Sequence, residues 1–292
     1  MDGFLNLLKP PGMSSHDAID SVRKILGMKR VGHAGTLDPA AAGVLPIAVG
    51  QAARLVEYLE LADKSYRAEI RFGMATDSGD DTGEVTERME HVSMPEEAAI
   101  RAALARFTGR IEQHPPAHSA IKIQGKRACD LVRRGVAVDL PTRTVEIYRL
   151  ALLERGERTL LIDVDCSKGT YIRSLCYDIG QALSIPATMA FLVRTRVGDF
   201  SLSAAHTIEE LRDLGEAAVL PPEQYLSHIE RYDLAPHRSK AFQNGLPTHA
   251  RKNPPRGDLL RVYSEGEFLG IGRYAREEQE IVPVKVFLRE AK

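Results

Sequence analysis

Apolar and charged side chains alternate strictly between Tyr66 and Phe72. This period of two predicts a strand with one face in the core and one face in solvent. Weaker versions of the pattern predict strands at residues 143–149, 158–166 and 188–200. Three further short strands are expected near residues 258–264, 267–274 and 280–288, separated by glycine and charged turns.

Other segments repeat their apolar residues at helical spacing. Ser14 or Ser15 can cap a helix whose apolar face runs from Ile19 to Leu26. Ser93–Glu96 has the pattern of a capping box with proline at an early helical position, and predicts a helix through Phe107. Further helices are expected at residues 52–59, from residue 170, from residue 207, and in a short segment that ends at residue 245.

Strands and helices mix without a regular βαβ rhythm, which favours an α+β fold with a mixed sheet over a Rossmann fold. A chain of 292 residues should hold about two domains. We expect a boundary between about residues 222 and 235, followed by a small β-rich module. No internal repeat or low-complexity tract interrupts either part.

Composition narrows the class of protein. Hydrophobic content of 43% and charged content of 27% are typical of a soluble globular protein. No stretch resembles a signal peptide or reaches the ~20 apolar residues of a membrane span, so we expect a cytosolic protein without a membrane partner. Cys129, Cys166 and Cys176 are scattered, which argues against a disulfide framework or a zinc site. Cys166 and Cys176 fit small buried hydrophobic positions.

Charge is unevenly distributed although the net charge is only −1. Residues 77–98 are rich in acids and are expected to form a solvated acidic edge. Residues 122–149 are rich in lysine and arginine, and a second basic set flanks residues 32–39. Either basic set alone could be a solvated face. Together they suit a one-sided binding site for a polyanion.

The most informative motif is Gly32–Pro39, where Asp38 is the single acid between glycines that permit close backbone approach. Pro39 biases Asp38 away from helix, so the carboxylate is presented from an extended or turn segment. Such a carboxylate can serve as nucleophile, base or anchor, although Asp-Pro is also ordinary turn chemistry. The glycines are not followed by Lys-Ser/Thr, which excludes a Walker A loop.

Six motifs between about residues 5 and 200 together resemble the TruB family of tRNA pseudouridine synthases, in order and in spacing. They are Leu7–His16, Val31–Pro39, Lys64–Tyr66, Pro115–Pro116 with Ser119–Lys122, Gly169–Arg173 and Leu192–Thr195. Taken singly, Tyr66 and Leu192 would be core residues and Arg173 a surface cation. The chain departs from the family at His118 and Cys129, where tyrosine is common. The tail from about residue 233 resembles a divergent PUA module.

The resemblance implies a fold and a domain division. A catalytic domain would cover residues 1–230, with a mixed, mostly antiparallel sheet and an RNA-gripping insertion at about residues 112–145. A PUA-like RNA-binding domain would cover residues 233–292. The compact chain is similar to the stand-alone bacterial type, which implies a monomer with no obligate protein partner.

The resemblance also implies the activity and the site. The substrate would be uridine 55 in the T arm of tRNA, isomerised to pseudouridine without metal or cofactor. Asp38 would be the nucleophile, Arg173 would pair with it through a two-bond fork, and Tyr66 would stack on the uracil and take a proton late in the reaction. Substrate-binding residues would be Tyr171 and Leu192 in the pocket, His33 in the space left by the flipped base, and the basic residues Lys9, Lys64, Lys122, Lys126, Arg127 and Arg133.

Two other functions are compatible with parts of the pattern. A non-catalytic tRNA-binding or tRNA-folding protein could use the same surface. A carboxylate hydrolase acting on a small sugar lacks an obvious second carboxylate and leaves the basic segment unexplained. The residues leave open whether Asp38 attacks C1′ of the ribose, attacks C6 of the ring, or assists a glycal route.

Overall fold

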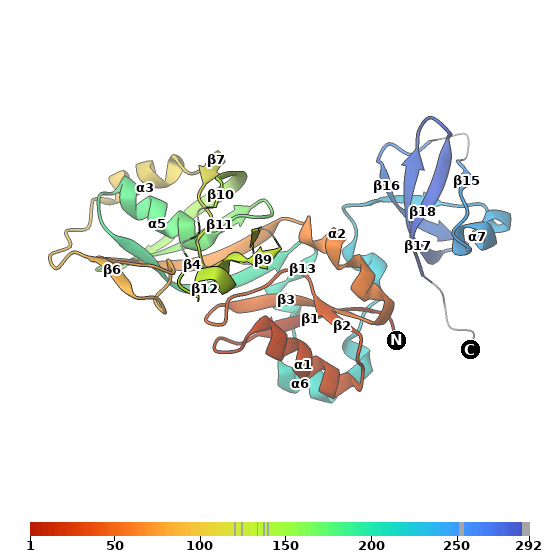
Figure 1. Cartoon of the computed structure of the whole chain (residues 1–292), viewed down its shortest axis with the longest axis horizontal. Helices are drawn as coiled ribbons and strands as arrows, with labels where there is room; N and C mark the ends of the chain where they lie inside the picture. Colours follow the sequence, from red (N-terminus) through yellow and green to blue (C-terminus); the bar gives the residue numbers. More distant parts are fainter. Residues whose placement is uncertain are drawn as a thin grey trace.

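A nine-stranded sheet organises the first two thirds of the chain (Figure 1). The computed structural model describes residues 1–119, 121–123, 125–132, 134–136, 138, 140–250 and 254–287. The main path of the sheet is β1 (Gly3–Lys9), β3 (Ala42–Val49), β12 (Ala187–Val197), β4 (Lys64–Phe72), β11 (Thr159–Cys166), β10 (Arg143–Arg155) and β7 (Gly109–Gln113). Two short strands, β2 (Val31–His33) and β13 (Phe200–Ser201), pair with β3 and β12.

Among the described strand pairs of this sheet, β12 and β3 alone run parallel, with Arg194 opposite Gly43. The other pairs are antiparallel. The predicted α+β class with a mixed, mostly antiparallel sheet is therefore confirmed. The parallel pair matters for function because it places β12 beside the chain segment that follows Asp38.

Helices pack beside the sheet, and their ends show which capping predictions hold. The helices are α1 (Ser15–Leu26), α2 (Val56–Glu60), α3 (Glu97–Ala105), α4 (Ala128–Val132), α5 (Ile172–Ala182) and α6 (Ile208–Leu214). Ser14, one of the two predicted caps, is the N-cap of α1 and forms a capping box with Asp17. The capping box expected at Ser93 is wrong. Glu96 has extended backbone at ψ 151°, so α3 begins after it without a side-chain cap.

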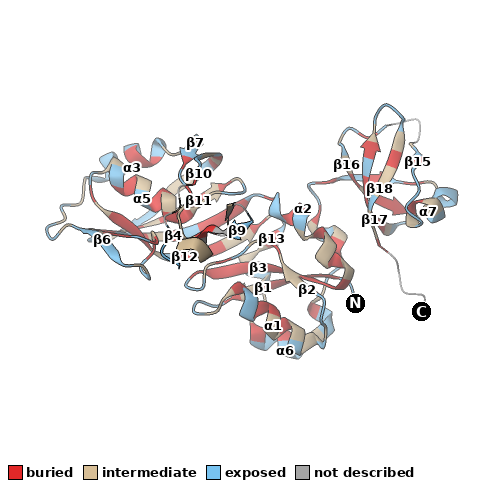
Figure 2. Cartoon of the chain, viewed as in Figure 1, coloured by how far each residue is buried: buried red, intermediate tan, exposed pale blue. Residues whose placement is uncertain are grey.

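Buried residues, red in Figure 2, are concentrated along the strands of the sheet. Every residue of β3 is buried, and its sequence has no alternating pattern that would predict a strand. A strand buried on both faces has an apolar run in place of alternation. Cys166 and Cys176 are both buried to 0% exposure, which confirms their predicted place in the core.

Small elements fill the remainder of this part. Two hairpins are formed by β5 (Met74–Thr76) with β6 (Val85–Arg88), and by β8 (Lys122–Ile123) with β9 (Lys126–Arg127). Short 3₁₀ turns lie at η1 (Gly50–Leu55), η2 (Leu202–Ala204), η3 (Gly215–Ala218) and η4 (Pro222–Tyr225).

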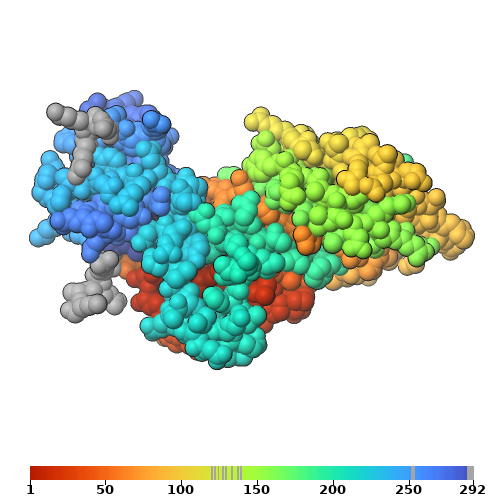
Figure 3. Space-filling model, turned by 180° about the vertical axis from the view of Figure 1, so that it is seen from behind, coloured from red at the N-terminus to blue at the C-terminus, as the bar shows by residue number. Residues whose placement is uncertain are grey.

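The C-terminal residues form a separate lobe, blue in Figure 3. Its five strands are β14 (Glu230–Asp233), β16 (Leu259–Ser264), β17 (Glu267–Ala275), β18 (Glu280–Val286) and β15 (Thr248–His249), with α7 (Pro236–Gln243) beside them. Ile271 and Phe287 of this lobe share an apolar cluster with Leu55, and Lys285 lies 2.9 Å from Glu57. Among the described residues no helix is long and apolar enough to cross a membrane.

Candidate active site

Asp38 lies in the loop between β2 and β3. The backbone of its two neighbours is held by hydrogen bonds to residues near the start of α1. Leu37 is 3% exposed, and its N–H and C=O both bond the Ser15 hydroxyl at 2.9 Å. The Pro39 carbonyl accepts from the N–H of Gly12 at 2.8 Å. The side chain of Asp38 itself is 39% exposed. The loop therefore presents one solvent-accessible carboxylate from an anchored backbone.

Arg173, on the first turn of α5, is brought next to Asp38. Its Nε lies 3.2 Å from Oδ2 of Asp38, and its side chain is 7% exposed. The predicted pairing is present, but the predicted two-bond fork is not. Nη1 donates to the carbonyl of Ser78 at 2.9 Å and Nη2 to the carbonyl of His118 at 2.8 Å. The guanidinium thus joins three segments, because its planar N–H groups point in fixed and different directions.

A second carboxylate faces Arg173 from the turn before β6. Oδ2 of Asp80 lies 3.7 Å from Nη1 of Arg173, and the Asp80 side chain is 10% exposed. Its other oxygen accepts from the Ser78 hydroxyl at 2.8 Å and the Thr82 hydroxyl at 2.6 Å. The expectation of a solvated acidic edge is wrong for this residue. A buried charge needs a charged or hydrogen-bonded partner, and Arg173 supplies one from 93 positions away in the sequence.

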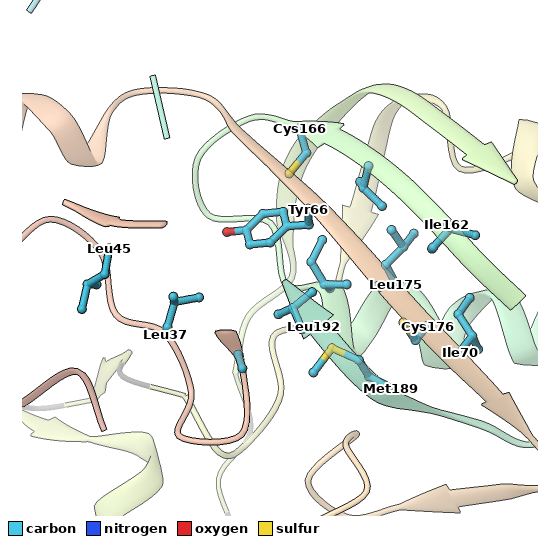
Figure 4. Close-up of a cluster of buried hydrophobic side chains, with 14 of the residues drawn as sticks. Leu37, Leu45, Tyr66, Ile70, Ile162, Cys166, Leu175, Cys176, Met189 and Leu192 are labelled. Atoms are coloured by element: carbon cyan, nitrogen blue, oxygen red, sulfur yellow. The ribbon is translucent and has the colours of Figure 1, made fainter. Parts of the chain in front are cut away.

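Tyr66 lies on β4 with its ring in the core and its hydroxyl directed toward the side of Leu37 and Leu45 (Figure 4). It is 8% exposed. Burial raises the pKa of its phenol to about 12, and the nearby Arg194 guanidinium opposes that shift. Leu192, 7% exposed on the adjacent strand β12, belongs to the same apolar cluster as Tyr66 and Leu37. Asp38, Tyr66 and Leu192 are thus brought to one region of the sheet.

Two of the four lysines predicted to bind substrate, Lys9 and Lys64, are buried. Nζ of Lys9 donates to the carbonyls of Pro10 at 2.9 Å, Met13 at 2.6 Å and Pro39 at 3.2 Å. Nζ of Lys64 donates to the carbonyls of Ala62 at 2.7 Å and Glu60 at 3.1 Å. Burial lowers the pKa of each to about 8. An ammonium has three donors, so these contacts favour a structural role over direct RNA contact.

The two other predicted substrate-binding residues are His33 on β2 and Tyr171 at the start of α5. His33 is half-buried on β2, and burial lowers its pKa below the usual 6.5. Its Nδ1 is buried without a hydrogen-bond partner among the described residues. Tyr171 precedes α5, and its backbone bonds Gln113 in both directions at 2.8 and 3.0 Å. The guanidinium of Arg143 lies 5.7 Å from the Tyr171 ring centroid.

The basic segment is described only in part. Lys126 is exposed on β9. The side chains of Lys122 and Arg127, and the whole of Arg133, lie outside the described residues. The described residues hold no group of three His, Cys, Asp or Glu side chains that could bind a metal ion.

Two residues that the sequence did not predict belong to this region. Asp80 is the first, and the turn residues Ser78, Gly79 and Thr82 around it were a signal that it could be enclosed. Arg194 is the second. It is 2% exposed and donates to the carbonyl of Gly35 in the Asp38 loop at 2.9 Å. It lies in the Leu192–Thr195 motif, but a sequence gives no direct sign that an arginine is buried.

Comparison with known proteins identifies the family to which the chain belongs. Residues 23–172 match the N-terminal domain of the TruB family pseudouridylate synthases. Residues 173–229 match the tRNA pseudouridylate synthase B C-terminal domain, and residues 232–287 match the C-terminal domain of pseudouridine synthase II TruB. The chain therefore belongs to the TruB family of pseudouridylate synthases, as its motifs predict.

Individual relatives agree with this placement. The tRNA pseudouridine synthase B of Alkaliphilus oremlandii is 44% identical, over 98% of this chain and 97% of its own. The protein of the same name from Symbiobacterium thermophilum is 48% identical, over 86% of this chain and 84% of its own. A chain in the crystal structure of a Cbf5-Nop10-Gar1 complex aligns with a TM-score of 0.76 at 29% identity, covering 98% of this chain and 84% of that chain.

Proposed function

We propose that this enzyme isomerises uridine 55 in the T arm of tRNA to pseudouridine, with Asp38 as the nucleophile. One observation carries the proposal: the accessible Asp38 carboxylate contacts the buried guanidinium of Arg173 at 3.2 Å. The cation stabilises the ionised carboxylate that a nucleophile requires. The family membership of the chain and the names of its relatives support uridine in tRNA as the substrate.

The reaction breaks the bond between N1 of uracil and C1′ of the ribose, turns the base, and joins C5 to C1′. C5 loses a proton and N1 gains one, so substrate and product are isomers. Asp38 holds the reacting end of the nucleotide, whether by attack at C1′, attack at C6, or assistance of a glycal route. Tyr66 and Leu192, which share an apolar cluster, would form the wall against which the free uracil turns, and Tyr171 would line the pocket.

The target uridine is stacked within a folded RNA arm, so it must leave the stack to reach Asp38. Extrusion of a base costs a few kcal/mol, which contacts in the vacated space offset in part. His33 is our candidate for that space, since desolvation favours its neutral ring. The exposed Lys126 and the other basic residues of the insertion would hold the RNA backbone. The C-terminal lobe, as a PUA-like module, would add a second grip.

We further propose that the enzyme works in the cytoplasm as a monomer, without an obligate protein partner or cofactor. The resemblance to the stand-alone bacterial type supports this. Sedimentation of the protein alone and with one equivalent of tRNA tests the monomer.

The decisive experiment incubates the protein with T-arm RNA that carries tritium at C5 of uracil. Release of tritium with recovery of pseudouridine supports the proposal, because only formation of the new C5 bond removes that label. RNA binding without tritium release would indicate a non-catalytic RNA-binding protein. Free uracil in the supernatant would indicate a hydrolase. Asp38→Asn is the matched control for background exchange.

A further inference from the structure

Arg194 is the largest side chain among those that the structure describes as fully buried. No carboxylate of the described residues lies within the 4.0 Å of an ion pair with it, in contrast to Arg173. Burial lowers its pKa from the ordinary arginine value, so its charge is disfavoured at this position. A buried cation without a direct anion is costly and calls for a physical reason.

Arg194 donates hydrogen bonds to backbone carbonyls on both sides of Asp38 in the chain. Nε donates to the carbonyl of Val44 at 2.8 Å, after Asp38 in the chain. Nη2 donates to Gly35 at 2.9 Å and Nη1 to Thr36 at 3.4 Å, both before Asp38. One rigid guanidinium therefore spans both ends of the loop that carries the nucleophile.

The backbone of Arg194 reaches the same segment. In the parallel pair of β12 and β3, Arg194 lies opposite Gly43. A Cβ at Gly43 would lie 2.2 Å from the Arg194 carbonyl oxygen, and the φ of Gly43 is +114°. Only glycine permits so close an approach in this conformation. The strand and its arginine side chain thus hold the loop together.

Arg194 is also a neighbour of Tyr66 in the sheet. The two residues are direct partners in the antiparallel pair of β12 and β4, so their side chains leave the same face of the sheet. The guanidinium lies close to the Tyr66 hydroxyl, and its positive charge opposes the rise in the pKa of the phenol. Asp38 is near enough for its charge to favour the charged form of Arg194.

We propose that Arg194 is a positioning residue that fixes the Asp38 loop and the Tyr66 ring relative to each other, and so sets the space in which the uracil turns. The inference rests on the roles proposed above for Asp38 and Tyr66. Arg173 contacts the carboxylate directly, whereas Arg194 acts through the loop backbone and the phenol. Three backbone carbonyls accept hydrogen bonds from Arg194. Arginine has five N–H groups in a fixed plane, whereas lysine has three on a flexible chain.

The test compares Arg194→Lys with Arg196→Lys, a control two residues along β12. Arg196 is partly buried and donates to the Ser65 hydroxyl at 3.1 Å, outside the Asp38 loop. We expect Arg194→Lys to lower kcat on T-arm RNA by about 100-fold, the effect of small misplacement of a reactive group, with the Kd for RNA unchanged. Arg196→Lys should keep both constants. A loss confined to RNA affinity, or equal losses in the two variants, would overturn the assignment.

A double-mutant cycle with Tyr66→Phe separates positioning from general stability. If Arg194 acts through the phenol, Arg194→Lys should cost much less kcat in the Tyr66→Phe background than in wild type. Equal costs in both backgrounds would contradict the coupling to Tyr66. Arg194→Gln, with a planar amide and two N–H donors, serves the same cycle if Arg194→Lys fails to fold.

Hydrogen exchange gives a readout that does not depend on turnover. Backbone amides of residues 35–44 should exchange faster in Arg194→Lys than in wild type or Arg196→Lys. The substitution removes the hydrogen bonds from the guanidinium to the carbonyls of Gly35, Thr36 and Val44. Unchanged exchange of these amides would contradict the proposal that Arg194 holds the Asp38 loop, even if the wild-type enzyme proved inactive on T-arm RNA. The tritium assay on wild type tests the proposed function separately.

Discussion

Nε of Arg173 lies 3.2 Å from Oδ2 of Asp38, and the two side chains differ in exposure, at 7% and 39%. The anion faces the solvent and its cation lies behind it. This arrangement suits an enzyme for a polyanion, because RNA phosphates could compete for an exposed arginine. Here the arginine is held by the carbonyls of Ser78 and His118, which keep it beside the carboxylate.

Asp38→Asn should remove turnover while the fold and RNA binding remain. The substitution keeps the size of the side chain and removes its charge and nucleophilic oxygen. Tritium release from T-arm RNA and a filter-binding titration measure the two properties. Substantial tritium release by Asp38→Asn would contradict its role as nucleophile.

Arg173→Lys should lower kcat severely, by about 100-fold or more, with a modest change in RNA affinity. Lysine keeps the charge but cannot reach Asp38 and the carbonyls of Ser78 and His118 with one planar group. Single-turnover kinetics at saturating RNA provide the measurement. Near-normal turnover would mean that the pairing with Asp38 is not needed for the reaction.

Asp80→Asn should lower kcat by about 10- to 100-fold, less than Asp38→Asn, because Asp80 acts on the nucleophile only through Arg173. Asparagine can still accept from the Thr82 hydroxyl, so the turn should persist. The same single-turnover assay applies, and Asp81→Asn, an exposed neighbour, is the matched control. Equal behaviour of the two variants would place Asp80 outside the chemistry.

His33 should titrate below its ordinary value of 6.5, since burial lowers its pKa. The unfolded chain then binds this proton more readily than the folded chain. The contribution of His33 to stability is therefore complete above pH 6.5 and is lost as the pH falls through the folded pKa. An NMR titration of the His33 imidazole measures the midpoint. A midpoint at or above 6.5 would contradict the prediction.

The basic insertion should hold RNA more strongly than the C-terminal lobe. Replacing Lys122, Lys126, Arg127 and Arg133 by alanine should weaken binding and reduce the salt slope by about one unit for each phosphate that is no longer neutralised. Chemistry at saturating RNA should persist. Truncation of the lobe beyond about residue 233 should cost less.

Titration of T-arm RNA across a salt series ranks the two variants. Loss of turnover on truncation, with wild-type behaviour of the four-site variant, would show that the main grip lies in the C-terminal lobe.

The local elements of the chain could be predicted from sequence. The alternation from Tyr66 to Phe72 became β4, and the Ser14 cap became the start of α1. Both signals depend on neighbours within a few residues, so a short stretch of sequence contains all the interactions involved. The Asp38 loop was found in the same way, from glycines and a proline that restrict the backbone locally.

The environment of the charged residues depends on long-range packing. Lys9 and Arg194 have the same ionic character as the exposed Lys126, yet both are buried against carbonyls from other segments. Asp80 lies in an acidic stretch of sequence but is enclosed by Arg173. A buried charge persists only where distant acceptors or counter-charges converge on it, and that convergence is a property of strand order and register. The amino-acid sequence alone thus specified the Asp38 loop and the charged residues available to it, because those signals are local. The fold determined which charged side chains are exposed beside Asp38 and which are buried behind it, because that depends on strand order and register.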